Sequence, residues 1–267
     1  MSDLLVKPTP PDADGCILDI TPVSAGWKHV GFAVHQLDAG EFLQCKSESR
    51  ETCIVVVSGT VTVNAAEQSF TGVGGRTSPF DDQPPGAVYV PPGVEFHVIS
   101  ESAAEVALCT APSAGGHDVR LIEPGDMSQI ERGEGTNTRY VRNILPETEP
   151  ADSLLVVEVI TPSGHWSSYP PHKHDSDNIP EESALEETYY HRIDPPQGFV
   201  LQRVYTDDRS IDETVSAYDR DVVLVPRGYH PVGAPHGYVS YYLNVMAGPN
   251  RIWIFKNDPD HEWIVGD

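Results

Sequence analysis

Short segments rich in valine, isoleucine, tyrosine and phenylalanine recur along the whole chain, and each is cut off by proline, glycine or aspartate. None of them keeps a 3.6-residue apolar period over four turns, as a long amphipathic helix would. β-Branched and aromatic residues favour strands, which proline and glycine end. The pattern therefore predicts an all-β protein, a sandwich or a barrel. The segments expected to be strands include residues 52–57, 60–63, 87–90, 154–160, 198–205, 222–225, 239–246 and 251–255.

Two pairs of matching segments indicate an internal repeat. Residues 90–94 (VPPGV) resemble residues 225–229 (VPRGY), 135 positions later, and residues 51–54 (ETCI) resemble residues 187–190 (ETYY), 136 positions later. Both offsets are close to half of the 267 residues, although VPxG is also a common way to end a strand. We expect two similar β-barrel domains, residues 1–146 and residues 147–267, with a linker near residues 147–153.

The charge of the chain limits its partners. Forty acidic residues against 17 lysines and arginines give a net charge of −23. Nucleic acids and anionic membranes are bound mainly by clustered lysine and arginine, so neither is an expected partner. No apolar run approaches the roughly 18 residues of a membrane span, and the N-terminus lacks a basic segment followed by an apolar one. We expect a soluble, cytoplasmic protein, and exposed strand edges favour a homo-oligomer.

The histidines are concentrated in the second half, which holds seven of the eleven. His172 and His174 lie in the sequence PPHKH, where prolines keep the chain extended, so that alternate side chains project to the same face. Glu187 opens an aromatic strand and His230 follows a Pro-x-Gly turn, each where a strand enters or leaves a barrel. Three imidazoles and one carboxylate suit a divalent ion such as Zn, Mn, Fe, Co or Ni, without selecting one. Strand parity alone does not choose between Glu186 and Glu187.

His-x-His, then Glu, then P-x-G-x-H is the pattern of the cupin superfamily. Within it the chain resembles the 5-deoxy-glucuronate isomerase family of myo-inositol catabolism, related to 4-deoxy-L-threo-5-hexosulose-uronate ketol-isomerase. The resemblance rests on GGRTSPFD at residues 74–81, WSSYPPHKHD at 166–175, LEETYYHR at 185–192 and PRGYHP at 226–231, and it covers nearly the whole chain.

The resemblance implies a bicupin, two tandem double-stranded β-helix (jelly-roll) barrels. It places the metal ligands at His172, His174, Glu187 and His230. The first copy has no His-x-His, and Glu95 stands near the place of His230, so this barrel is expected to carry no metal.

The resemblance also implies a reaction. The substrate is a small anionic sugar acid, 5-deoxy-D-glucuronate, which the family converts into 5-dehydro-2-deoxy-D-gluconate. Such an aldose–ketose isomerisation builds negative charge on oxygen, which a divalent ion stabilises. Two alternatives keep the same ligands: a cupin Fe(II) dioxygenase, which requires oxygen, and a non-enzymatic bicupin that binds sugar acids.

Polar residues that alternate along expected strands are candidates for the remaining roles. Glu158 is the preferred base, or else a carboxylate paired with a cation. Arg203 suits the substrate carboxylate by a bidentate contact, or else forms a structural salt bridge. Tyr242 is a candidate to relay a proton, or else its hydroxyl bonds to the backbone. Lys173 lies between two inward ligands and should face away from the metal.

Overall fold

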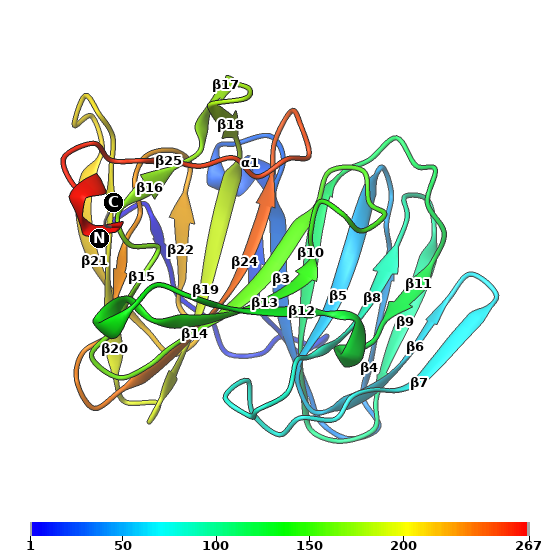
Figure 1. The fold of residues 1–267 in the computed structure, drawn as a ribbon. Helices are drawn as coiled ribbons and strands as arrows, with labels where there is room; N and C mark the ends of the chain where they lie inside the picture. The colour runs from blue at the N-terminus through cyan, green and yellow to red at the C-terminus, as the bar shows by residue number, and fades with distance from the viewer. Residues whose placement is uncertain (1, 266–267) are drawn as a thin grey trace. The chain divides into compact units, whose positions relative to one another are not determined.

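The computed structural model describes residues 2–265 and consists almost entirely of β-strands, which confirms the all-β prediction (Figure 1). Its backbone divides into two units. We call residues 8–128 and 143–156 the N-terminal unit, and residues 2–7, 129–142 and 157–265 the C-terminal unit. The chain thus passes between the units more than once, whereas the sequence places one boundary after residue 146. That boundary stays a prediction.

The strands are mostly short, as the frequent prolines and glycines require. In the N-terminal unit they are β2 (Cys16–Ile20), β3 (Gly31–Leu37), β4 (Phe42–Lys46), β5 (Arg50–Ser58), β6 (Thr60–Ala65), β7 (Gln68–Gly74), β8 (Gly86–Val90), β9 (Glu95–Ser100), β10 (Ala104–Pro112) and β11 (Arg120–Ile122). Those of the C-terminal unit, with β12, β13 and β14 extending into the N-terminal one, are β1 (Leu5–Val6), β12 (Ser128–Arg132), β13 (Arg139–Leu145), β14 (Leu155–Thr161), β15 (Trp166–Ser167), β16 (His172–Lys173), β17 (Asp175–Asn178), β18 (Glu182–Ala184), β19 (Glu186–Asp194), β20 (Phe199–Tyr205), β21 (Asp212–Tyr218), β22 (Val222–Val225), β23 (Val232–Gly233), β24 (Val239–Ala247) and β25 (Lys256–Asn257).

Helices are few and short in the described part of the chain. They are α1 (Pro22–Ala25) and 3-10 turns at Pro124–Asp126, Gly135–Asn137 and Glu262–Val265. Across residues 2–265, none has the length and apolar character that a membrane-spanning helix needs.

The N-terminal unit has an apolar core formed by two sheets, β11-β8-β5-β10-β3-β2 and β4-β9-β6-β7. Burial alternates along β6, with Val61, Val63 and Ala65 inside, because successive side chains of a strand point to opposite faces. They join Ile54 and Val88 of the other sheet in the core. Each fully buried valine or isoleucine of this core contributes about 1.5–3 kcal/mol, which holds the two sheets together.

The C-terminal unit repeats this strand order. In its larger sheet, β22-β19-β24-β14 corresponds to β8-β5-β10-β3 of the N-terminal unit. Glu187 of β19 lies opposite Val225 of β22, and Thr52 of β5 lies opposite Val90 of β8. Subtracting the offset of 136 from Glu187 gives Glu51, and subtracting 135 from Val225 gives Val90. The pairing of β19 with β22 therefore agrees with that of β5 with β8 to within one residue. The repeat seen in the sequence is therefore a repeat of structure.

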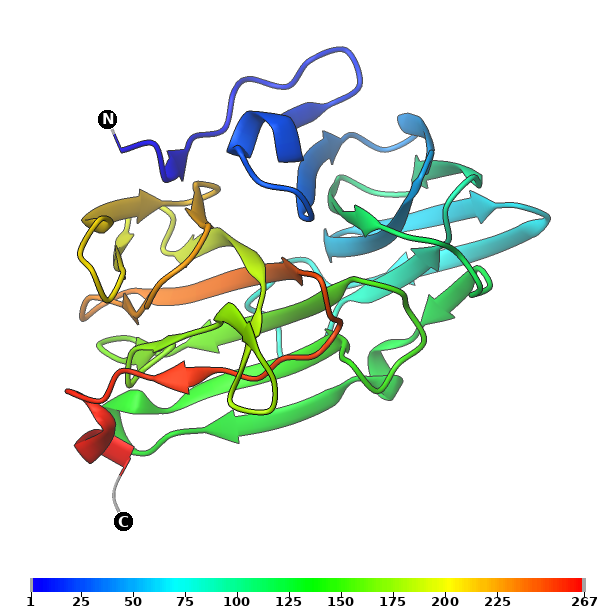
Figure 2. The same ribbon diagram turned by 90° about the horizontal axis from the view of Figure 1, so that it is seen from above.

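Residues 251–255 form no strand, so that prediction is wrong. Ser183 N donates to the Ile254 carbonyl at 2.9 Å, and Ile254 N donates to Ser183 Oγ at 3.0 Å. In Figure 2 this segment, drawn in red, passes beside the hairpin of β17 and β18. The segment has the composition of a strand because its aromatic side chains pack, while its backbone bonds to the single residue Ser183 instead of forming a ladder.

Candidate metal centre

Strand β19 directs alternate side chains into the interior of the C-terminal unit. Glu187, Tyr189 and His191 lie on one face of the strand because side chains alternate. The antiparallel register places Tyr242 of β24 directly opposite His191. The centroid of the Tyr242 ring lies 4.8 Å from that of Tyr189 and 6.0 Å from that of His191. Tyr242 therefore shares the face that carries Glu187.

The His-x-His segment presents two imidazoles to one side. The ring centroids of His172 and His174 lie 6.2 Å apart, and both side chains are buried. Lys173 points away from them, and its Nζ lies 2.8 Å from Asp175 Oδ1 and 3.1 Å from Asp207 Oδ2. The extended conformation thus separates two inward histidines from an outward lysine held by carboxylates.

His230 is oriented by the turn that precedes it. Gly228 in this turn has a φ of +92°, a conformation that glycine adopts without strain, and a Cβ there would clash with the carbonyl oxygen of Tyr205. The Gly228 carbonyl accepts a hydrogen bond from His230 Nδ1 at 2.8 Å. The glycine therefore permits both the turn and the contact that fixes the imidazole.

Three imidazoles and one carboxylate meet in the interior. The candidate ligand atoms of His172, His174 and His230 all lie within 4.8 Å of one another. Glu187 Oε2 lies 3.1 Å from His174 Nε2 and 3.3 Å from His230 Nε2. All four residues are buried, whereas Glu186 is half-buried. The structure thus brings together the three histidines that the sequence analysis selected, with Glu187 beside two of them.

The hydrogen bonds of the histidines leave ligand atoms available. His174 Nδ1 donates to the Leu185 carbonyl at 3.2 Å, as His230 Nδ1 does to its own turn, so Nε2 of each ring is the nitrogen that faces the cluster. His230 Nε2 is buried and has no hydrogen-bond partner within residues 2–265. An unsatisfied buried nitrogen is costly unless something binds it. This arrangement fits a metal ion, which a histidine triad can hold.

The protonation of the imidazoles supports the same conclusion. Burial lowers the pKa of His172 well below its ordinary value and lowers that of His230 to about 4. For His174 burial also acts to lower the pKa, but the hydrogen bond and charge of Glu187 outweigh it and raise the pKa. The lowered pKa values keep His172 and His230 neutral, which is the form in which imidazoles bind metals, while the Glu187 carboxylate favours a proton on His174.

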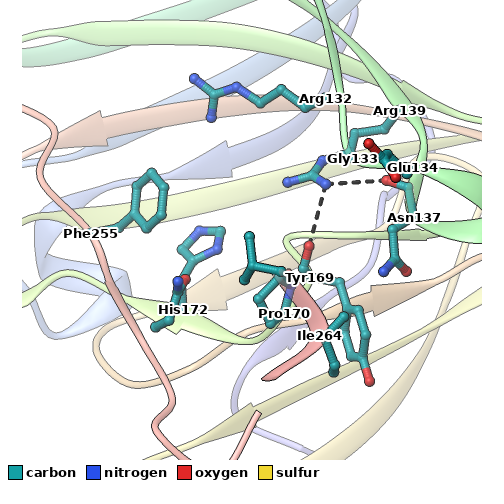
Figure 3. A pocket seen from close by; sticks show the side chains of 12 residues that line it. Arg132, Gly133, Glu134, Asn137, Arg139, Tyr169, Pro170, His172, Phe255 and Ile264 are labelled. Carbon is teal, nitrogen blue, oxygen red and sulfur yellow. Dashed lines mark hydrogen bonds between the residues drawn. The ribbon is translucent and has the colours of Figure 1, made fainter. Parts of the chain in front are cut away.

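A pocket of about 570 Å³ adjoins the cluster at His172. Phe255 packs against the His172 ring, with 4.7 Å between the centroids. Two arginines, Arg132 and Arg139, also line the pocket (Figure 3). The cavity therefore combines the edge of the histidine cluster with an aromatic wall and positive charge.

Glu158, the predicted base, is fully buried in an ion pair. Its Oε1 lies 3.1 Å from Arg142 Nη1. Arg142 and Arg139 are three positions apart on β13, so their side chains leave opposite faces of the strand. Since Arg139 lines the pocket, the pair of Arg142 and Glu158 lies on the other face of the sheet. The catalytic role of Glu158 stays a prediction, and its paired carboxylate favours the structural alternative.

Arg203 lies on β20 with a side chain that is 42% exposed. Its Nε and Nη2 donate to the two carboxylate oxygens of Asp212 at 2.8 and 2.9 Å. The adjacent Gln202 is fully buried instead, and its Oε1 accepts a hydrogen bond from His191 Nε2 at 2.9 Å. On β20 Gln202 therefore points inward, whereas the sequence analysis expected Arg203 to do so. The assignment of Arg203 to the substrate stays a prediction, which its bidentate bond to Asp212 does not favour.

Several residues of this region were not selected from the sequence. Gln202 was missed because alternation has two phases, and the wrong one was chosen. Arg132, Arg139 and Phe255 were missed because nothing in their local sequence distinguishes them from other arginines and aromatic residues. Only Tyr169, which also lines the pocket, had a signal, since it directly precedes PPHKH.

Known proteins match the chain over almost its whole length. The KduI/IolB family model matches residues 4–264. The chain is 52% identical to 5-deoxy-glucuronate isomerase from Geobacillus kaustophilus over 265 residues, which are 99% of this chain and 96% of that protein. It is 51% identical to 5-deoxy-glucuronate isomerase from Bacillus subtilis strain 168 over 269 residues, which cover 99% of both proteins.

Solved structures show the same fold. The crystal structure of an IolB-like protein from Salmonella typhimurium superposes with a TM-score of 0.96 at 52% identity, covering 98% of this chain and 99% of that one. Oxalate decarboxylase from Bacillus subtilis, which has Mn(II) centres, superposes with a TM-score of 0.67 at 12% identity, covering 96% of this chain and 80% of that one. At that identity the likeness concerns the fold alone, and it confirms the bicupin prediction.

Proposed function

The chain belongs to the KduI/IolB family, and we propose that it is an aldose–ketose isomerase that converts 5-deoxy-D-glucuronate into 5-dehydro-2-deoxy-D-gluconate. The relatives that match it over their full length are named for this substrate. One observation in the structure carries the proposal: a buried cluster of three histidines opens at His172 onto a pocket lined by two arginines. Such a site suits a small anionic sugar.

We propose that His172, His174, Glu187 and His230 hold a divalent metal ion. The neutral imidazoles and the carboxylate suit Zn, Mn, Fe, Co and Ni alike, and the donor set does not select among them. When bound, such an ion acts as a Lewis acid that stabilises negative charge on substrate oxygens. The chain's own contribution includes the orientation of His174 and His230, whose imidazoles are fixed by bonds to backbone carbonyls.

We assign a proton-transfer role to the Tyr242 hydroxyl. Burial raises the pKa of Tyr242, and the nearby hydroxyls of Ser167 and Ser168 oppose the rise. The hydroxyl therefore keeps its proton at neutral pH and donates it to a substrate oxygen. Ser168 Oγ also lies 2.9 Å from the Tyr189 hydroxyl. The hydroxyls of Tyr242, Ser168 and Tyr189 therefore form a short chain. The C2 hydroxyl of the substrate loses its proton as the ketone forms, and such a chain can carry that proton back to Tyr242.

Incubation of the purified protein with 5-deoxy-glucuronate, followed by NMR in deuterated buffer without oxygen, tests the proposal. We expect the ketose to form, its formation to stop after chelation, and a divalent ion to restore it. The variant His172→Ala should be inactive. The matched control His236→Ala removes an exposed histidine and should keep full activity.

Two results would contradict the proposal. One is the absence of ketose after metal has been restored. The other is full turnover by the His172→Ala variant. Consumption of substrate that begins only when oxygen is admitted would instead indicate the dioxygenase alternative, and binding without turnover would indicate a binding protein.

A further inference from the structure

The two arginines of the pocket have no carboxylate partner in the part of the chain that the structure describes. Within residues 2–265, neither Arg132 nor Arg139 forms an ion pair, although Glu134 also lines the pocket. Arg139 Nη1 donates to the backbone carbonyls of Asn137 at 3.1 Å and Tyr169 at 3.3 Å (Figure 3). These bonds fix the guanidinium and use one of its two terminal nitrogens, so the rest of the donor fork is open to an anion.

Other basic side chains of the C-terminal unit contrast with this pair. The cations that form ion pairs there with carboxylates include Arg142, Lys173, Arg192, Arg203 and Arg220. In a chain with 40 acidic residues against 17 lysines and arginines, carboxylates are abundant, so arginines that lie at a cavity without one among the described residues are candidates to bind an external anion. Two of them at one cavity indicate a site where an external anion completes the charge balance.

Arg139 lies close to the histidine cluster. It lines the same pocket as His172, and its Nη1 donates to the carbonyl of Tyr169, three positions before His172. Arg139 therefore lies near the proposed reacting centre, and it is not one of the candidate metal ligands. A six-carbon uronate has its carboxylate at the opposite end from its aldehyde, so one end can meet the arginines while the other meets the histidines.

We propose that Arg139, with Arg132 beside it, binds the carboxylate of the substrate while the aldehyde end lies at the histidine cluster. This inference rests on the proposed isomerase function. The bidentate fork of Arg139 fixes the direction of the sugar in the pocket, and Arg132 adds positive charge. The site therefore selects uronates over neutral aldoses of the same length, and it draws an anion to a protein that carries a net charge of −23.

The test compares two substrates in three proteins. The substrates are 5-deoxy-glucuronate and 5-deoxy-glucose, which has a hydroxymethyl group in place of the carboxylate. The proteins are the wild type, Arg139→Met and the matched control Arg209→Met, in which an arginine that is 47% exposed is neutralised. Loss of a charge-assisted contact should lower kcat/KM for the uronate by about 10- to 100-fold and leave that for the neutral sugar nearly unchanged.

The neutral sugar separates loss of binding from loss of structure, because a misfolded or metal-free variant would lose both activities equally. If Arg139→Met cannot be purified, Arg132→Met gives the same comparison, with a smaller expected loss. Calorimetry with the C1-reduced alditol acid, which keeps the carboxylate and cannot isomerise, should show weaker binding to the Arg139→Met variant. Arg139→Lys should recover part of that binding because it keeps the charge.

An unchanged preference for the uronate in Arg139→Met would overturn the inference, as would a larger loss in Arg203→Met. Either result leaves the isomerase function standing, since the wild type still forms ketose. Absence of ketose with the wild-type protein would instead refute the proposed function.

Discussion

Glu51 is the counterpart of Glu187 in the N-terminal unit, and we predict that it stabilises the fold instead of binding metal. It is fully buried at the start of β5. Its carboxylate accepts hydrogen bonds from the backbone N–H groups of Asp152, Ser153 and Leu154 at 2.8, 2.6 and 2.6 Å and from the Tyr89 hydroxyl at 2.6 Å. The carboxylate therefore fastens the segment that was expected to be a linker.

The variant Glu51→Gln should lower the free energy of unfolding because it changes these hydrogen bonds. Oε1 accepts from Ser153 and Leu154, and Oε2 accepts from Asp152 and Tyr89. If the amide oxygen of the glutamine takes the place of Oε1, its NH2 group takes the place of Oε2. The Tyr89 hydroxyl can turn to accept a hydrogen bond from this NH2 group, but the Asp152 N–H then faces an amide N–H. Loss of that bond costs about 1–3 kcal/mol, and the other bonds weaken when the charge is lost. We expect a total loss of about 3–5 kcal/mol.

Urea titration and thermal unfolding measure this loss. A change of this size should lower Tm by on the order of 10 °C. Metal content should remain that of the wild type. The matched control Glu67→Gln, at an exposed turn of the same unit, should change stability by no more than about 0.5 kcal/mol. A loss below about 1 kcal/mol for Glu51→Gln, or a loss of bound metal, would refute the reasoning.

Three further variants test the C-terminal unit. Glu187→Gln should reduce bound metal at least tenfold by elemental analysis and reduce the metal-dependent rise in Tm; an unchanged metal content would show that Glu187 is not a ligand. Tyr242→Phe should lower kcat by about 100-fold with metal content unchanged, and a decrease of less than twofold would exclude proton transfer by this hydroxyl. Glu158→Gln should lower the free energy of unfolding by about 2–3 kcal/mol through its bond to Arg142, whereas a kcat at least 100-fold lower would restore its predicted role as base.

Much of the candidate metal centre could be predicted from the sequence because its signals are local. His172 and His174 are two positions apart in an extended segment, so their common direction depends only on the backbone of three residues. His230 follows a Pro-x-Gly turn whose glycine fixes the local geometry. The resemblance to cupins then selected Glu187 over Glu186, a choice that local spacing left open.

The sequence by itself determined the all-β fold and its internal repeat, because strand-forming segments and their spacing are properties of the chain alone. Only the tertiary structure decided which phase of β20 faces inward, and therefore that Gln202 meets His191 while Arg203 bonds to Asp212. It also decided that Arg139 reaches the pocket beside His172. Alternation in a strand has two phases with equal local geometry, and the choice between them depends on which face packs against distant strands.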